Sequence, residues 1–245
     1  MVQLTDVLAR RALSNQVIHA GKTTVGDVRR WLYDQLWENR VGTWFQPDLR
    51  VQRRAKKNDA SRGFLAVSPE STVIERGDVV HLDFGITYLG LNTDWQKMAK
   101  VLHEGEKAAP AGLRRPIKNT NELQDALTLR TARPGKVAGD VYNQAMEEMK
   151  QKGIEAQIYS HPIGNQGHGL GPSIDFAAAQ PEHMASTHAK RLRKGSYISV
   201  ELNTQAAVPE WDNQKVYIMM EDDACLTDEG YKFLRPRQED FYLIK

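Results

Sequence analysis

The sequence predicts an α+β fold with internal pseudo-two-fold symmetry. Amphipathic helical patterns alternate with apolar runs of strand length along the 245-residue chain. Two stretches, GKTTVGDV at residues 21–28 and GKVAGDV at residues 135–141, share a Gly-Lys opening and a Gly-Asp-Val block. Each stretch precedes an amphipathic helix and, further on, paired strands, which favours an internal duplication. A chance similarity between two capped helices is the alternative.

The composition is that of an ordinary globular protein. Charged residues make up 26% of the chain and hydrophobic residues 40%, which excludes wholesale disorder and low-complexity arrays. The length suits a single domain. Cys225 is the only cysteine, so an intramolecular disulfide and a cysteine-based zinc cluster are both excluded.

The sequence favours a cytoplasmic protein with neither a membrane nor a nucleic acid as partner. It has no run of about 18 apolar residues that could span a bilayer, and its N-terminus lacks the apolar segment of a signal peptide. The net charge of +2 is small. Because no aromatic residues lie among the basic side chains of residues 50–57, we expect residues 46–62 to form an irregular, solvated loop and not a nucleic-acid surface.

Two helices are expected at the N-terminus. Residues 4–20 show near-helical spacing of their leucine and valine side chains. Thr24 and Asp27 have the spacing of a capping box. The apolar residues at positions 25, 28, 32 and 36 then mark one buried face of a helix that runs to about Arg40.

Strands and further helices are expected in the rest of the chain. Val79–Gly85 has the pattern of a buried strand, and Thr87–Trp95 that of its return strand. Residues 103–133 are expected to be partly helical, with breaks at Pro110 and Pro116. The remaining predicted elements are a helix ending at about Lys152, strands at residues 196–203 and 215–226, and a polar tail over residues 233–245.

Carboxylates occupy strand positions where apolar residues would be expected. Asp83, Glu201 and Glu221 each interrupt a run of apolar residues. A buried ionised carboxylate is costly unless it is paired or bound to a metal ion. Three such residues in three predicted strands therefore call for a common explanation.

Asp94 is expected to join this group through a hairpin. If the chain turns at Leu89-Gly90, residue 96 lies opposite Asp83, and Asp94 lies opposite Gly85. Asp83 and Asp94 are then diagonal neighbours on one face of the sheet. Gly85 has no side chain and leaves room between them.

The fifth candidate ligand is His168, which lies between glycines in Gly-His-Gly-Leu-Gly. Four carboxylates and one imidazole could hold two divalent cations. The oxygen-rich ligand set favours Mn²⁺, with Fe²⁺, Co²⁺ or Zn²⁺ as alternatives. Two such ions about 3.5 Å apart can hold a bridging hydroxide as nucleophile and polarise a carbonyl group, so the chemistry implied is hydrolysis.

These motifs, in this order, resemble those of the pita-bread metallopeptidases. That family comprises methionine aminopeptidases, Xaa-Pro aminopeptidases and Xaa-Pro dipeptidases, and the creatinases are its metal-free relatives. The resemblance covers residues 5–245. It implies a curved antiparallel sheet with helices on its outer face, and it implies that residues 1–245 form a single metallopeptidase-like catalytic domain.

The resemblance also implies roles for individual residues. Asp83 would bind one ion, Asp94 and Glu221 would bridge the two ions, and His168 and Glu201 would complete the ligand set. Glu201 would also act as the general base. In the proline-specific branch another histidine lies before the metal-binding histidine, which makes His161 a catalytic candidate. His81, two residues before Asp83 and on the same face, would either contact that carboxylate or pack within the strand.

The sequence departs from the family pattern in two places. Family peptidases usually have a histidine seven residues after the metal-binding histidine, often followed by glutamate, whereas Asp175 and Phe176 stand at those positions counted from His168. Residues 46–75 lack the histidine that the family tends to carry before the first aspartate strand. These departures concern proton transfer and substrate orientation and leave the metal ligands intact.

The sequence therefore predicts a dinuclear metal-dependent exopeptidase that acts on short peptides, with Xaa-Pro bonds favoured over N-terminal methionine. One alternative is a pseudoenzyme that keeps the pita-bread fold as a binding module. Another is a creatinase-like hydrolase that cleaves a C–N bond without metal. A homodimer is a further expectation, because the proline-specific relatives are often dimers.

Overall fold

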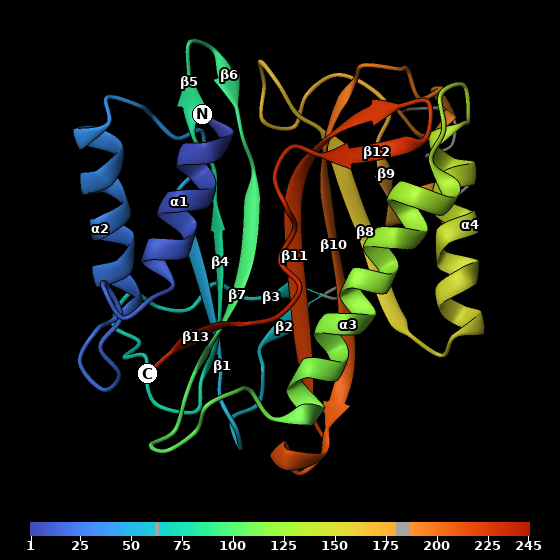
Figure 1. Cartoon of the computed structure of the whole chain (residues 1–245). Coiled ribbons are helices and arrows are strands. Elements are labelled where there is room, and N and C mark those ends of the chain that lie inside the picture. The colour runs from blue at the N-terminus through green and yellow to red at the C-terminus, as the bar shows by residue number, and fades with distance from the viewer. Residues whose placement is uncertain (62–63, 180–186) are drawn as a thin grey trace.

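A nine-stranded sheet forms the centre of the computed structural model, which describes residues 1–61, 64–179 and 187–245 (Figure 1). Seven strands follow one another in the order β1-β4-β7-β11-β10-β8-β9, and neighbours in this path are antiparallel. Their bounds are β1 Asp48–Gln52, β4 Val79–Phe84, β7 Trp95–Val101, β11 Gln214–Thr227, β10 Tyr197–Val208, β8 Glu155–Pro162 and β9 Ile174–Asp175. Two more strands extend the sheet: β12 (Gly230–Phe233) pairs with β11, and β13 (Tyr242–Ile244) runs parallel to β7.

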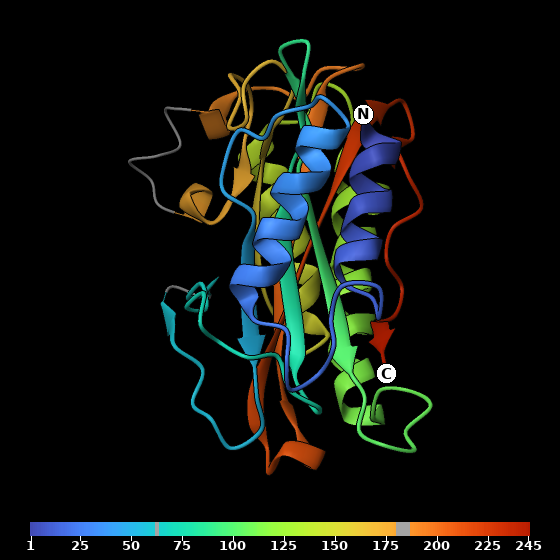
Figure 2. The same cartoon turned by 90° about the vertical axis from the view of Figure 1, so that its left-hand side faces the viewer.

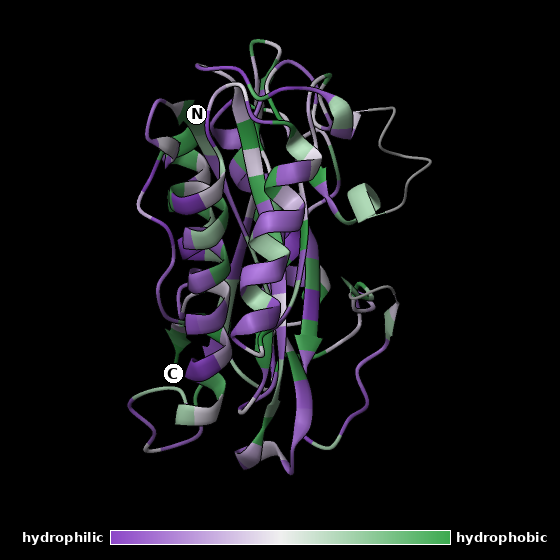
Figure 3. Cartoon of the chain, turned by 90° about the vertical axis from the view of Figure 1, so that its right-hand side faces the viewer, coloured by the Kyte–Doolittle hydropathy of each residue, from purple (hydrophilic) through white to green (hydrophobic). Residues whose placement is uncertain are grey.

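Four helices cover the outer face of this curled sheet. Helices α1 (Val2–Ala12) and α2 (Val25–Glu38) lie side by side over the strands of the N-terminal half (Figure 2). Helices α3 (Ala111–Asp125) and α4 (Ala138–Gln151) cover β10, β11 and β8, and both carry a mixture of hydrophilic and hydrophobic residues along their length (Figure 3). The predicted α+β class, with a curved antiparallel sheet and outer helices, is therefore confirmed.

The two halves repeat one arrangement of helices, strands and core. One apolar cluster lies beneath α1 and α2, and a second lies between α4 and the strands of the C-terminal half. The residues that precede α2 and α4, Thr24 and Val137, each form an isolated antiparallel bridge, to Val73 and Arg191 respectively. This equivalence agrees with the predicted internal duplication.

The predicted capping box at the start of α2 is present. The Thr24 hydroxyl accepts a hydrogen bond from the Asp27 backbone N–H at 3.1 Å, and the Asp27 carboxylate accepts one from the Thr24 N–H at 2.9 Å. Helix α4 has Asp140 at the equivalent position, but Val137 at its N-cap offers no side-chain oxygen. The two related helices thus begin differently.

Two N-terminal predictions are wrong. Helix α1 ends at Ala12 and does not reach residue 20. Residues 48–52, expected in a solvated loop, form strand β1, which pairs Arg50 with His81 and Asp48 with Asp83. The sequence pattern did not indicate this strand because its charged side chains pair with residues that are distant in the sequence, as Asp48 does with Arg29.

Proline breaks fewer helices than expected. Helix α3 continues through Pro116, whose carbonyl accepts hydrogen bonds from the Thr120 and Thr204 hydroxyls. Pro116 lies in the second turn, so its missing N–H removes a single hydrogen bond. Pro110 precedes the helix as its N-cap.

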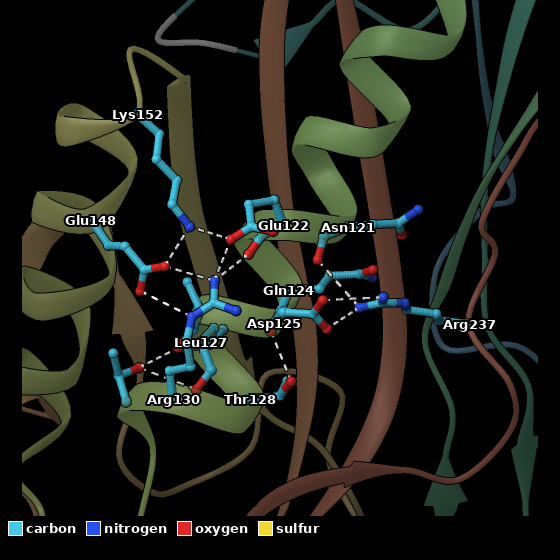
Figure 4. A network of polar contacts seen from close by, with 12 residues as sticks. Asn121, Glu122, Gln124, Asp125, Leu127, Thr128, Arg130, Glu148, Lys152 and Arg237 are labelled. Atoms are coloured by element: carbon cyan, nitrogen blue, oxygen red, sulfur yellow. Dashed lines mark hydrogen bonds and ion pairs between the residues drawn. The ribbon is translucent and has the colours of Figure 1, made fainter.

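A π-helix, Ala126–Thr131, continues α3. Around this junction, Arg130 contacts Glu122 and Glu148, and Lys152 contacts the same two carboxylates (Figure 4). On the other side of α3, Arg237 from the C-terminal segment binds Asp125 (Figure 4). These ion pairs tie α3 to α4 and to the C-terminal segment.

The hairpin after β4 has the predicted register, but its return strand is not the predicted segment Thr87–Trp95. A small hairpin of β5 (Thr87–Tyr88) and β6 (Leu91–Asn92) forms its tip, and the long return strand β7 begins only at Trp95. Asp83 nevertheless lies opposite Gln96, as predicted. A Cβ atom at Gly85 would come within 2.2 Å of the Thr93 carbonyl oxygen, so glycine is required where these two backbone segments approach each other.

The remaining elements are short. Strands β2 (Ala60–Ser61) and β3 (Phe64–Leu65) pair with each other. Within the described residues, 3₁₀ turns cover Phe176–Ala179, Thr187–Ala189 and Pro209–Trp211. The expected polar tail contains β13 and therefore contributes to the sheet. Within the described ranges, no helix is both long enough and apolar enough to cross a membrane.

Candidate metal centre

The candidate site lies at the seam between the two halves, where β7 pairs with β11 through Gln96 and Glu221. The N-terminal half contributes Asp83 from β4 and Asp94 from the residue preceding β7. The C-terminal half contributes one residue from each of β8, β10 and β11: His161, Glu201 and Glu221. Glu201 and Glu221 are direct cross-strand partners. Like charges in that position are destabilising unless a cation or proton separates them.

Three side chains converge closely enough to hold one metal ion. Ligand atoms of Asp94, His161 and Glu221 all lie within 4.8 Å of one another, and all three residues are buried. The His161 Nε2 atom lies 3.4 Å from Glu221 Oε1 and 3.5 Å from Asp94 Oδ2. Glu201 is adjacent, because its Oε2 atom is 3.6 Å from the same nitrogen.

Two buried atoms of this group have no hydrogen-bond partner among the described residues. His161 Nδ1 lies 3.1 Å from the Pro162 carbonyl oxygen, to which its N–H can donate. This tautomer leaves the lone pair of Nε2 directed at the carboxylates, as in metal-binding histidines. Among the described residues, His161 Nε2 and Glu221 Oε2 have no hydrogen-bond partner. The other oxygen of Glu221 accepts a hydrogen bond from the Ser199 hydroxyl. These observations fit a divalent cation.

The electrostatics also fit a bound cation. Burial, followed by repulsion from Glu221, raises the pKa of Asp83 to about 8 and the pKa values of Asp94 and Glu201 well above their usual range. Burial lowers the pKa of His161, but the nearby Glu221 carboxylate, followed by Glu201, outweighs it and raises that pKa to about 9. A divalent cation relieves such repulsion and favours the ionised carboxylates and the neutral imidazole.

His168 lies beside this group and not within it. Its ring contacts the His161 ring edge-on, with centroids 4.3 Å apart, and contacts the Trp44 ring at 5.5 Å. The side chain is on the exposed loop that follows β8. From the sequence, His168 was expected to be a metal ligand and His161 a catalytic residue, whereas the geometry brings His161 to the carboxylates.

Asp83 has a different environment. Its Oδ2 atom lies 3.4 Å from Arg50 Nη1 and 3.3 Å from Gln96 Nε2. The Gln96 amide nitrogen also donates a short hydrogen bond to Glu201. His81 is fully buried between Arg50 and Gln96, at 3.3 Å and 3.1 Å from them. The carboxylate at this end of the site is therefore held by donors from the protein itself.

Two further carboxylates near the site have structural partners. Asp222 is buried with Lys97, whose ammonium group also donates to the Glu221 carbonyl at 2.9 Å. Asp175, which stands seven residues after His168, lies 2.7 Å from His188 Nε2. Neither carboxylate belongs to the three-residue group described above.

Sequence reasoning missed Arg50, Gln96 and Ser199. Ser199 lies two residues before Glu201, so strand alternation places both on one face. Gln96 was placed opposite Asp83 but was given no role. Arg50 could have been found from the alternation of Asp48, Arg50 and Gln52 with two apolar residues, had the basic run not been interpreted as a loop.

Comparison with known proteins identifies the family. The profile of metallopeptidase family M24 matches residues 5–228. This chain belongs to that family. The resemblance seen in the sequence is thereby confirmed, and the fold agrees with it. No curated protein sequence matches the chain.

Solved structures share the fold at low identity. The X-Pro aminopeptidase of Thermotoga maritima superimposes with a TM-score of 0.73 at 20% identity, over 99% of this chain and 60% of that protein. The prolidase of Thermococcus sibiricus gives 0.70 at 17% identity, over 100% and 59%. The methionine aminopeptidase of Thermotoga maritima gives 0.63 at 20% identity, over 95% and 94%. The chain thus spans about three fifths of the first two relatives.

Proposed function

We propose that this chain is a metal-dependent exopeptidase, an aminopeptidase or dipeptidase that hydrolyses short peptides and prefers Xaa-Pro bonds. The observation that carries the proposal is the convergence of Asp94, His161 and Glu221, with the metal-facing atoms of His161 and Glu221 unsatisfied. Membership of a metallopeptidase family supports the peptidase activity. The similarity of the fold to structures of an X-Pro aminopeptidase and a prolidase supports the Xaa-Pro preference.

In this proposal, Asp94, His161, Glu201 and Glu221 hold a divalent metal ion, with Mn²⁺ favoured for its affinity for oxygen ligands. When bound, the ion polarises the scissile carbonyl and lowers the pKa of a coordinated water. Glu201, beside His161, is the proposed general base. Asp83, the remaining ligand expected from the sequence, contacts Arg50 and Gln96 instead.

The two histidines exchange the roles expected from sequence. His161 faces the carboxylates, and His168 lies at their rim, where it can contact a substrate. They stand seven residues apart, which is the separation usual in this family between the metal-binding histidine and the next one. Counted from His161, the missing auxiliary histidine is present as His168, followed by Gly169 in place of glutamate.

Peptide hydrolysis by the purified protein tests the proposal. We expect Mn²⁺-dependent release of the N-terminal residue, its loss with a chelator and its recovery when metal is restored. Glu201→Gln should lower kcat/KM by about 10²–10⁴-fold, as expected for a general base. Glu104→Gln, an exposed carboxylate change, is the control. A higher kcat/KM on an Ala-Pro substrate than on a Met-Ala substrate would support the Xaa-Pro preference.

The alternatives give different results. A protein that binds metal but hydrolyses neither substrate would be a binding module with the same fold. Hydrolysis of a C–N bond that persists in chelator would favour the creatinase-like alternative. Either result would overturn the proposed function.

A further inference from the structure

The carboxylates of the site divide into two groups with different partners. Asp94, His161 and Glu221 face one another, and two of their buried atoms have no hydrogen bond to the described protein. Asp83 accepts contacts from Arg50 and Gln96 on the same oxygen. A metal ion at that oxygen would compete with the two N–H donors for the same lone pairs.

Arg50 is held firmly at the Asp83 end. It lies on β1, opposite His81, and its Nε atom donates to the Leu65 carbonyl oxygen at 3.0 Å. Its side chain is 16% exposed, and that of Asp83 is 15% exposed. A guanidinium cation in this position offsets part of the negative charge around Asp83 and repels a second divalent cation.

A chain of hydrogen bonds from Arg50 through His81 fixes the Gln96 amide with its nitrogen toward Asp83. Arginine can only donate, so Nδ1 of His81 accepts from Arg50, and His81 Nε2–H donates to Gln96 Oε1. The Gln96 amide nitrogen is thereby directed at the carboxylates of Asp83 and Glu201. Rotating this amide would place its oxygen against two carboxylates. The buried side chain therefore spans the space between Asp83 and Glu201.

We propose that this centre holds a single divalent ion, at Asp94, His161, Glu201 and Glu221, and that Arg50 and Gln96 exclude a second ion from Asp83. The inference rests on the proposed metal site and revises the number of ions predicted from sequence. In this proposal, Asp83 accepts hydrogen bonds that hold Arg50 and Gln96 in place, and it does not bind a metal ion.

Counting metal ions tests this directly. The protein is stripped with a chelator, loaded with Mn²⁺, desalted and analysed by mass spectrometry, and its Mn²⁺ electron paramagnetic resonance spectrum is recorded. The wild type should hold one ion per chain, with the hyperfine-resolved signal of an isolated Mn²⁺. Asp83→Asn should keep that ion, and His161→Ala should lose it.

Opening the Asp83 end should admit a second ion. The double variant Arg50→Gln/Gln96→Ser should bind two ions per chain and show the signal of an exchange-coupled pair. Arg54→Gln is the matched control, because Arg54 is 58% exposed and pairs with Asp212. Thermal unfolding with chelator present verifies that each variant is folded, and the single variants of Arg50 and Gln96 replace the double variant if it is not.

The outcomes separate this inference from the proposed function. Two ions in the wild type would overturn the inference and leave the metallopeptidase proposal standing. One ion that is lost in Asp83→Asn but kept in His161→Ala would place the ion at the wrong end and overturn it too. Folded opened variants that still hold one ion would overturn the exclusion by Arg50 and Gln96. No bound ion in the wild type would overturn both proposals.

Discussion

The two halves of the molecule share an arrangement of helices and strands, but Asp83 in the N-terminal half and His161 and Glu221 in the C-terminal half have different hydrogen-bond surroundings. In the N-terminal half, protein donors already satisfy Asp83 through Arg50 and Gln96. In the C-terminal half, His161 and Glu221 keep buried atoms without hydrogen-bond partners in the described structure. We infer from this comparison that the donors around a carboxylate, and not its presence alone, decide whether it would hold a cation.

The largest expected effect concerns the two neighbouring histidines. His161→Ala should weaken Mn²⁺ binding by more than about 100-fold, the upper end of what changes outside the ligand shell cost. His168→Ala should keep the metal and lower kcat/KM, because His168 lies at the rim. Isothermal titration with Mn²⁺ measures the first effect, and steady-state kinetics measures the second. Metal loss in His168→Ala alone would reverse the assignment.

The next effect concerns the ion pair that joins the halves. Lys97 on β7 and Asp222 on β11 are both buried, so Lys97→Ala leaves an unpaired buried carboxylate. We expect a loss of about 3–5 kcal/mol in the free energy of unfolding, measured in denaturant. Lys118→Ala, an exposed change on α3, should stay within about 0.5 kcal/mol. Equal losses in both variants would show that the buried pair contributes little.

Gly85→Ala tests the close approach of the backbone at Gly85 to the carbonyl group of Thr93. The new Cβ atom would lie 2.2 Å from the Thr93 carbonyl oxygen and 2.8 Å from Trp44 Nε1, so the backbone must move. The expected cost is about 1–3 kcal/mol, the range for overpacked sites, visible as a lower Tm. Gly42→Ala meets nothing closer than 3.8 Å and is the control. An unchanged Tm in Gly85→Ala would contradict the close approach.

The capping box of α2 gives a smaller, pH-dependent effect. The hydrogen bonds from Thr24 and Arg30 lower the pKa of Asp27 to about 2. Since the folded pKa lies below the unfolded one, this stabilisation is complete above about pH 4 and is lost as the pH falls towards 2. Asp27→Asn should cost about 1 kcal/mol or less at neutral pH, because Asp27 is 49% exposed, and should flatten this dependence. Denaturant unfolding at several pH values measures it.

The smallest expected effect comes from introducing the same capping box at the start of α4. Helix α4 has Asp140 in the matching position, but Val137 cannot accept a hydrogen bond. Val137→Thr should complete a capping box and stabilise the fold by about 0.5–1 kcal/mol, raising the denaturant midpoint. A lower midpoint would mean that the two helix starts are less equivalent than their sequences suggest.

Features set by local pattern could be predicted from the sequence. The capping box at Thr24, the pairing of Asp83 with Gln96 and the strands that carry Glu201 and Glu221 depend on neighbouring residues and on strand alternation. Strand β1 was missed because its charged side chains have partners that are distant in the sequence: Arg50, for example, contacts His81 and Asp83 on β4 and the Leu65 carbonyl oxygen. Its charges resemble those of a solvated loop until their distant partners are known.

The choice between the histidines illustrates the same limit. The glycines around His168 suggested a ligand, yet they belong to an exposed loop. His161 lies on β8, two strands away from Glu221 in the sheet. Only the pairing of β8 with β10, which local sequence does not encode, brings its ring to the carboxylates.

The position of the metal ion is the most direct test of this account. A crystal of the Mn²⁺-loaded protein, measured for anomalous scattering at the manganese edge, would locate each ion. We predict one peak within coordination distance of His161 Nε2, Asp94 and Glu221, with Arg50 and Gln96 still in contact with Asp83. A peak bound by His168, or a second peak at Asp83, would contradict the account.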